Sequence, residues 1–153
     1  MEPAILKGIY LFDNLTDEEL KKISGIIVKE KHAANSVLFR EGDKGDKFYI
    51  ILKGSVRISQ TISGAGEEAL TILEKGDYLG EMALIEDAPR SADAIIHEDS
   101  ELLVISKQDF DELLFFEKDI AYKMLWAFVR TLSARLRETN EKMKALLHMA
   151  GSF

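Results

Sequence analysis

The sequence of 153 residues contains no cysteine, which excludes disulfide bonds, iron–sulfur clusters and thiolate chemistry. Its three histidines, His32, His97 and His148, lie far apart along the chain, so no local spacing of metal ligands exists. Long apolar runs are also missing, because the longest uncharged apolar stretch, around residues 124–129, is much too short to span a bilayer. The N-terminus does not resemble a signal peptide. We therefore expect a cytoplasmic protein without a metal and without a membrane partner.

The composition that is present is that of an ordinary soluble globular domain, with 46% hydrophobic and 31% charged residues. The length suits one domain with a full core and is too short for two of the usual size. A net charge of −7 argues against general nucleic-acid binding, so we expect no direct DNA contact. From Ile120 onward six Lys and Arg residues outnumber two Glu residues, which gives +4 and leaves −11 for the preceding part. We interpret this basic segment as a solvated helix face.

The chain divides into three zones. Residues 5–27 predict helix, because Thr16 and Glu19 have the spacing of a capping box and an apolar stripe follows them. Residues 28–105 contain short β-type runs separated by glycine-containing breakers, which favours an antiparallel sandwich or barrel over βαβ units. Residues 106–150 are helical. The β-type runs are VLF, FYIILKG, SVRIS, LTILEKG, SADAII and LLVIS.

The last helical segment carries a heptad pattern. Between residues 119 and 149 there is no glycine or proline, and apolar residues recur in alternating steps of three and four for about four repeats. This pattern predicts dimerisation through the helix, and a single amphipathic helix lying on the sheet is the alternative. Trp126 and Phe128 lie off this seam and can serve the sheet side, whereas the polar Thr139 either sets the register or contacts something bound nearby. The seam comprises Tyr122, Leu125, Val129, Leu132, Leu136, Thr139, Met143, Leu146 and Ala150.

The stretch GEMALIEDAPRSA, at residues 80–92, places an arginine nine residues after a glutamate, with small residues between them. Together with FREGDKGDKFYIILKGSVRIS before it and RLRETNEKM after it, it resembles the cyclic nucleotide-binding domain shared by catabolite-activator-type regulators, cyclic-nucleotide-dependent kinases and gated channels. The resemblance implies an α+β fold, an antiparallel double-stranded β-helix or jelly-roll barrel with N-terminal helices and a long C-terminal dimerisation helix. It also implies one domain over residues 1–153, with a phosphate-binding cassette at residues 79–92.

The resemblance implies that Glu81 and Arg90 of the cassette bind opposite ends of a cyclic nucleotide. Glu81, an acceptor when ionised, suits the ribose 2′-hydroxyl. Arg90 matches the family's phosphate-binding arginine, and its planar fork suits two phosphate oxygens. Ser91 matches a hydroxyl position that adds a second phosphate contact. The alternative is that Glu81 and Arg90 merely pair with each other to close a loop.

Small residues of the cassette would let the main chain approach the ligand. Gly80 and Ala83 are small enough for close approach, and a helical turn that includes Met82 would direct its N–H groups at the phosphate. Asp93, just past the arginine, is expected near the pocket mouth, pointing outward along its strand by alternation.

The base would be contacted from the C-terminal helix. In the catabolite-activator branch two hydroxyl-bearing helix residues, one from each protomer, reach the base. RLRETNEKM aligns Thr139 and Asn140 with that pair, although Asn140 stands where that branch has a serine. The resemblance therefore gives Thr139 a reason to interrupt the seam.

These residues together predict a sensor that binds a cyclic mononucleotide, cAMP with cGMP as a possibility, and signals by repositioning its C-terminal helix. We expect a homodimer through that helix, an unknown downstream protein partner, and no enzymatic activity, because no nucleophile–base pair or metal set is present. No winged helix-turn-helix is recognisable after the helix, which suggests a stand-alone domain or a regulatory fragment. The alternative is a degenerate domain of this fold that serves as a dimeric interaction module without nucleotide.

Overall fold

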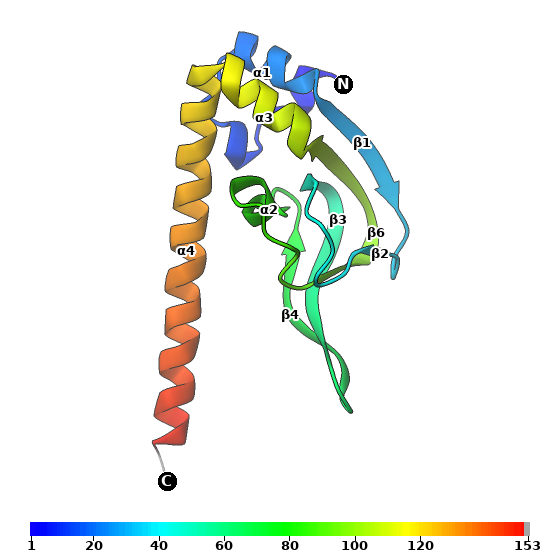
Figure 1. Cartoon of the computed structure of the whole chain (residues 1–153), viewed down its shortest axis with the longest axis vertical. Coiled ribbons are helices and arrows are strands. Elements are labelled where there is room, and N and C mark those ends of the chain that lie inside the picture. Colours follow the sequence, from blue (N-terminus) through cyan, green and yellow to red (C-terminus); the bar gives the residue numbers. More distant parts are fainter. Residues whose placement is uncertain (152–153) are drawn as a thin grey trace.

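The computed structural model of the chain describes residues 1–151, apart from the side chain of Ala83. Figure 1 shows an antiparallel sheet with short helices gathered at one end and one long helix running beside it. This α+β architecture confirms the predicted antiparallel sheet with helices before and after it. The elements are η1 (Pro3–Leu6), η2 (Tyr10–Phe12), α1 (Asp17–Ser24), β1 (Ile27–His32), β2 (Val37–Phe39), β3 (Lys47–Ile62), β4 (Gly66–Glu74), β5 (Tyr78–Leu79), α2 (Glu81–Ile85), β6 (Asp93–Ser106), α3 (Lys107–Phe116) and α4 (Lys118–Ala150).

Helix α1 begins where the sequence predicts a capping box. The Glu19 amide donates to the Thr16 hydroxyl at 3.2 Å, and the Thr16 amide donates to the Glu19 carboxylate at 2.9 Å. These two bonds satisfy main-chain donors that the first helical turn leaves without partners. The predicted capping box is confirmed, and Leu20 and Ile23 of the following stripe are buried.

Two long strands, β3 and β6, form the centre of the sheet, whose order is β1-β6-β3-β4, with β2 on β6 and β5 on β3. The sequence predicted two short runs within each of them, and this is wrong. The chain bends without ending β3, because the register with β6 shifts around Gly54, whose φ is +91°. Since β1 and β4 stand at the two ends of the strand order, closure into a jelly-roll barrel stays a prediction.

The core lies on both faces of the sheet. Phe48 and Ile50 pack with the helices in one cluster, whereas Tyr49 and Ile51, which alternate with them along β3, belong to a second cluster on the opposite face. On the helix side, edge-to-face and tilted ring contacts join Phe48, Tyr78 and Phe128 at centroid distances of 5.4–5.5 Å. This cluster fixes α4 against β5, immediately before the cassette begins.

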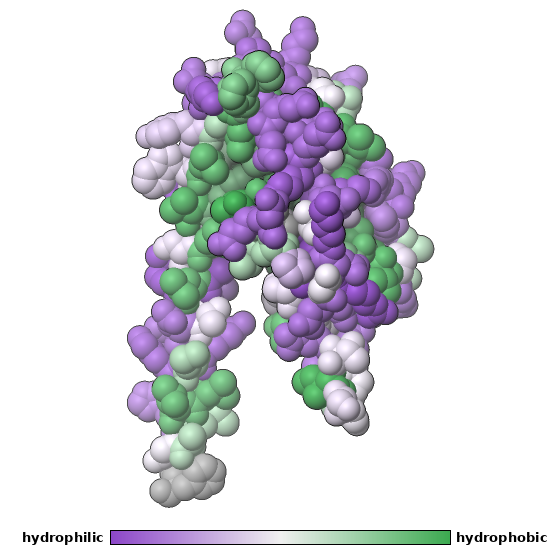
Figure 2. All heavy atoms as spheres, in the orientation of Figure 1, coloured by the Kyte–Doolittle hydropathy of each residue, from purple (hydrophilic) through white to green (hydrophobic). Residues whose placement is uncertain are grey.

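Helix α4 is buried only along its first part. Met124 and Phe128 are fully covered by the sheet and the other helices, as expected for Phe128, but Trp126 is 47% exposed, so its predicted place against the sheet is wrong. The later part of the helix runs beside the sheet but stands apart from it, and apolar side chains remain exposed along it (Figure 2). Within residues 1–151 no helix has both the length and the apolar character needed to cross a bilayer. The cytoplasmic location stays a prediction.

Candidate functional site

Arg90 is held in place by its main chain. Its amide donates to the Asp43 carbonyl and its carbonyl accepts from the Gly42 amide, each at 2.8 Å. One residue earlier, Pro89 forms an antiparallel bridge with Lys44. The turn at residues 40–43 therefore holds the cassette on both sides of the arginine.

The guanidinium of Arg90 is buried, with 6% of the residue exposed. Nη2 donates to the Lys47 carbonyl at 2.7 Å, and the group lies 4.2 Å from the centre of the Phe39 ring. Nε and Nη1 are buried and have no hydrogen-bond partner in the part of the chain that the structure describes. Burial lowers the pKa of this arginine, although the guanidinium stays charged at neutral pH. Buried donors are nearly always paired in proteins, so these two indicate an anion-binding position.

Gly80 makes room for this guanidinium. Its φ of +89° lies in the left-handed region, and a Cβ here would stand 2.7 Å from Arg90 Nη1 and 2.9 Å from the Lys47 carbonyl oxygen. Glycine is the residue that tolerates both the conformation and the close approach. The same residue caps the N-terminus of the short helix α2, which begins at Glu81.

Glu81 is buried, with 3% of the residue exposed, and it forms an ion pair with Arg135 of α4. Arg135 also donates to the Tyr78 carbonyl at 2.8 Å. One α4 side chain is therefore bonded to both β5 and the start of α2. The alternative of a Glu81–Arg90 pair is not found, because the hydrogen bond of Arg90 goes to Lys47.

The buried side chains of Glu81 and Arg90 border one pocket of about 440 Å³. The cassette forms one wall, β4 forms another, and α4 closes a third side. In Figure 2 the later part of α4 stands apart from the sheet, with open space between them. The lining residues are Phe39, Ile58, Leu70, Thr71, Leu73, Leu79, Gly80, Glu81, Met82, Ala88, Pro89, Arg90, Ser91, Ala92, Arg135, Glu138, Thr139 and Lys142.

Most of the predicted site residues meet at this pocket. Met82 and Ser91 line it from exposed positions, and Thr139 lines it from α4, with its hydroxyl donating to the Arg135 carbonyl at 2.9 Å. Asn140 does not belong to the lining. Ala83 lies in α2, but its side chain is outside the described part of the structure.

Asp93 differs from its prediction. It is 5% exposed and accepts hydrogen bonds from Glu41, Arg40 and Thr61, so it does not point outward at the pocket mouth. Strand alternation fails as a guide here, because the three residues that follow it on β6 are also buried. The sheet is covered on both faces at this point.

The sequence interpretation missed the other α4 residues of the pocket. Arg135, Glu138 and Lys142 lie within one turn of Thr139, so the 3.6-residue period could have placed them on the same helix face. The β4 wall carries no such signal, because Leu70, Thr71 and Leu73 read as an ordinary strand. In the described residues there is no group of three or more histidines and carboxylates that could hold a metal ion.

An antiparallel sheet with a buried, partly unpaired arginine opposite a buried glutamate suits a domain that binds a small anionic ligand. Residues 29–115 match the family model described as the cyclic nucleotide-binding domain. The chain belongs to the cyclic nucleotide-binding domain family.

Two curated relatives show the range of that family. The chain is 30% identical over 141 residues to the cyclic AMP receptor protein of Thermus thermophilus, covering 92% of this chain and 63% of the relative. It is 31% identical over 147 residues to human cGMP-dependent protein kinase 2, covering 95% of this chain and 19% of the kinase. The chain thus spans less than two thirds of the length of either relative. Among solved structures, a cyclic nucleotide-binding domain from Methylobacillus flagellatus matches with a TM-score of 0.80 and 27% identity, covering 91% of this chain and 78% of that one.

Proposed function

We propose that this chain is a regulatory domain that binds a cyclic mononucleotide, cAMP in the first place and cGMP as the competing candidate. The observation that carries the proposal is the Arg90 guanidinium, buried at the pocket with two nitrogen atoms, Nε and Nη1, that find no hydrogen-bond partner among the described residues. A phosphodiester supplies both the charge and the acceptors that such a group lacks. Without a ligand, the burial of an incompletely bonded charge costs free energy, which bound phosphate would offset.

The ribose would be bound at the buried carboxylate of Glu81. A carboxylate has about four acceptor sites, so Glu81 can hold Arg135 and a ribose hydroxyl at the same time. Arg135 belongs to α4, and a ligand at Glu81 therefore changes the surroundings of the side chain that connects α4 to the cassette. If α4 takes one position without ligand and another with ligand, the ligand shifts the balance between them only by its different affinity for the two. Hydrogen exchange of the α4 amides beyond residue 130, with and without cAMP, measures this response.

The choice of cAMP rests on α4. Thr139 lines the pocket at the position where the catabolite-activator branch places a base contact. The name of the Thermus relative includes cyclic AMP and the name of the human kinase includes cGMP, at nearly equal identity, so the relatives support either nucleotide. Titration calorimetry with cAMP, cGMP and cyclic dinucleotides decides among them.

Arg90→Leu tests the binding proposal. Loss of the charge that faces the phosphate should weaken cAMP binding about 100- to 1,000-fold, while the unliganded fold keeps its stability because an unpaired buried charge is removed. Arg137→Leu is the matched control, since Arg137 lies on the same helix as Thr139 and hydrogen-bonds Ser133 instead of the pocket. Equal cAMP affinity in Arg90→Leu and the unchanged protein would refute the assignment.

A homodimer through α4 is part of the proposal. Val129, Leu136 and Met143 of the predicted seam are more than half exposed in the single chain, as residues awaiting a partner helix would be. Leu136→Glu should therefore produce a monomer in light scattering, whereas Leu147→Glu, at an equally exposed position off the seam, should leave the dimer intact. A degenerate interaction module would dimerise in the same way and bind no nucleotide.

We propose regulation without catalysis. The pocket lining includes Arg90, Arg135 and the Glu81 carboxylate, which is already paired with Arg135, a set suited to holding a phosphodiester. Incubation of the protein with cAMP should release no AMP. Release of AMP would show an enzyme.

A further inference from the structure

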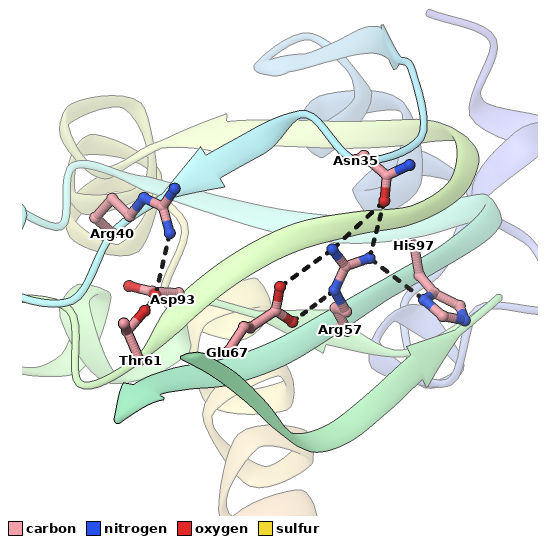
Figure 3. Close-up of polar contacts among 7 residues, drawn as sticks. All are labelled: Asn35, Arg40, Arg57, Thr61, Glu67, Asp93 and His97. Carbon is pink, nitrogen blue, oxygen red and sulfur yellow. Dashed lines mark hydrogen bonds and ion pairs between the residues drawn. The ribbon is translucent and has the colours of Figure 1, made fainter. Parts of the chain in front are cut away.

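The buried carboxylate of Asp93 lies outside the pocket and has no part in the proposed ligand contacts. Figure 3 shows it at the start of β6, with the side chains of Arg40 and Thr61 directed at it from two other segments. Oδ1 accepts from the Glu41 amide at 2.7 Å. Oδ2 accepts from Arg40 Nη1 and from the Thr61 hydroxyl, both at 3.3 Å. The bond to the Glu41 amide is the shortest of the three.

Two of the three residues that bond Asp93, Arg40 and Glu41, belong to the turn at residues 40–43. That turn is closed by its own bonds, in which the Arg40 amide donates to the Asp43 carboxylate at 2.9 Å and the Asp43 amide donates to the Arg40 carbonyl at 3.0 Å. The same turn bonds both sides of Arg90, through Gly42 and through Asp43. A chain of hydrogen bonds therefore runs from the Asp93 carboxylate through the turn to the main chain of Arg90.

We propose that Asp93 is a positioning residue for Arg90: its carboxylate fixes the turn at residues 40–43, and the turn fixes the arginine that would hold the phosphate. This inference rests on the proposed function. Asp93 bonds the turn and not the guanidinium, so its effect reaches the ligand through the placement of Arg90. Because the N–H groups of Arg90 must meet the phosphate from a buried position, a shift of its main chain would misplace them with little freedom to adjust.

The matched control lies six residues further along the same strand. Asp99 also accepts from a backbone amide, that of Ala34 at 2.8 Å, but it ties the loop between β1 and β2, away from the cassette. Asp93→Ala should weaken cAMP binding about ten- to a hundredfold, whereas Asp99→Ala should leave it unchanged. Asp93→Asn keeps an acceptor for the Glu41 amide and should restore most of the affinity. Adenosine, which lacks the phosphate, should lose little affinity in Asp93→Ala.

Hydrogen exchange in the unliganded protein tests the positioning itself. In Asp93→Ala the amides of Gly42 and Arg90 should lose protection from exchange. The amide of Ile96, which lies on β6 like Asp93 and donates to the Ser36 carbonyl, should keep its protection. If Asp93→Ala does not fold, Arg40→Gln provides the test, because the Arg40 side chain is 54% exposed and should tolerate the change. It should lower cAMP affinity about two- to fivefold.

The outcomes separate the two proposals. An unchanged protein that binds no cyclic nucleotide refutes the proposed function, and the exchange rates of Gly42 and Arg90 still decide the role of Asp93. Normal cAMP affinity in Asp93→Ala, or full protection of those two amides, overturns the positioning role. Equal losses for cAMP and adenosine also overturn it, since they would show general damage to the pocket.

Discussion

The cassette end and the helix end of the pocket are built differently. At the cassette end, Glu81 and Arg90 are almost fully buried and belong to one continuous segment held by main-chain hydrogen bonds. At the helix end, Thr139 is exposed and lies on the later part of α4, which stands apart from the sheet. The first is arranged before any ligand arrives, whereas the second depends on few contacts, with Arg135 prominent among them. The rigid cassette end is thus suited to binding the ligand, and the helix end opposite it is suited to changing position when the ligand binds.

The largest expected effect comes from crowding the rigid end. In Gly80→Ala the new Cβ would collide with Arg90 and with the Lys47 carbonyl, so the guanidinium must move, and cAMP affinity should fall at least about 100-fold. Gly76→Ala is the control, because Gly76 has a similar φ of +92° but nothing within 4 Å of the added Cβ. Both variants should lose about 1–3 kcal/mol of stability from backbone strain, measured by urea unfolding. Equal binding losses in the two would mean that strain, and not the collision, is responsible.

The connection between the two ends is the target of the next test. Glu81→Gln removes the charge that Arg135 and the ribose would share, and we expect about a ten- to hundredfold loss of cAMP affinity. Arg135→Gln should cost less, because its side chain is 36% exposed. A double-mutant cycle by calorimetry should show that the two losses do not add. Strictly additive losses would argue that α4 and the cassette are not coupled through this pair.

The helix end should give a smaller effect on affinity and a larger one on selectivity. Thr139→Val removes the hydroxyl and keeps the shape, so cAMP affinity should fall only about two- to tenfold. The ratio of cAMP to cGMP affinity should change in the same variant. Asn140→Ala is the comparison, because Asn140 does not line the pocket of its own chain. An unchanged ratio in both variants would place base selection elsewhere, for instance on the β4 wall.

The same contrast explains how much the sequence could predict. The cassette residues are close in sequence and fold locally, so GEMALIEDAPRSA was enough to bring Gly80, Glu81 and Arg90 to one pocket. Arg135 lies 54 positions from Glu81, and no local pattern shows that it would pair there instead of Arg90. The full length of β3 was missed because Gly54 bends this strand without ending it, and a glycine by itself looks like a break between strands.

The smallest expected effect is the pH dependence of the rigid end. The Glu41 amide bond, with the bond from Arg40, holds the pKa of Asp93 below its usual value of 3.8, against the opposing effect of burial. A lowered pKa in the folded state means that the ionised carboxylate stabilises the fold above the unfolded pKa. That contribution should be complete above about pH 5 and should be lost as the pH falls through 3.8 towards the folded value. Urea unfolding of the unchanged protein and of Asp93→Asn can be compared at about pH 6 and about pH 3, on either side of the titration of this carboxyl. The difference between their unfolding free energies should shrink as the pH falls. A difference that stays constant over this range would mean that the charge of Asp93 does not hold the turn, leaving only its shape to do so.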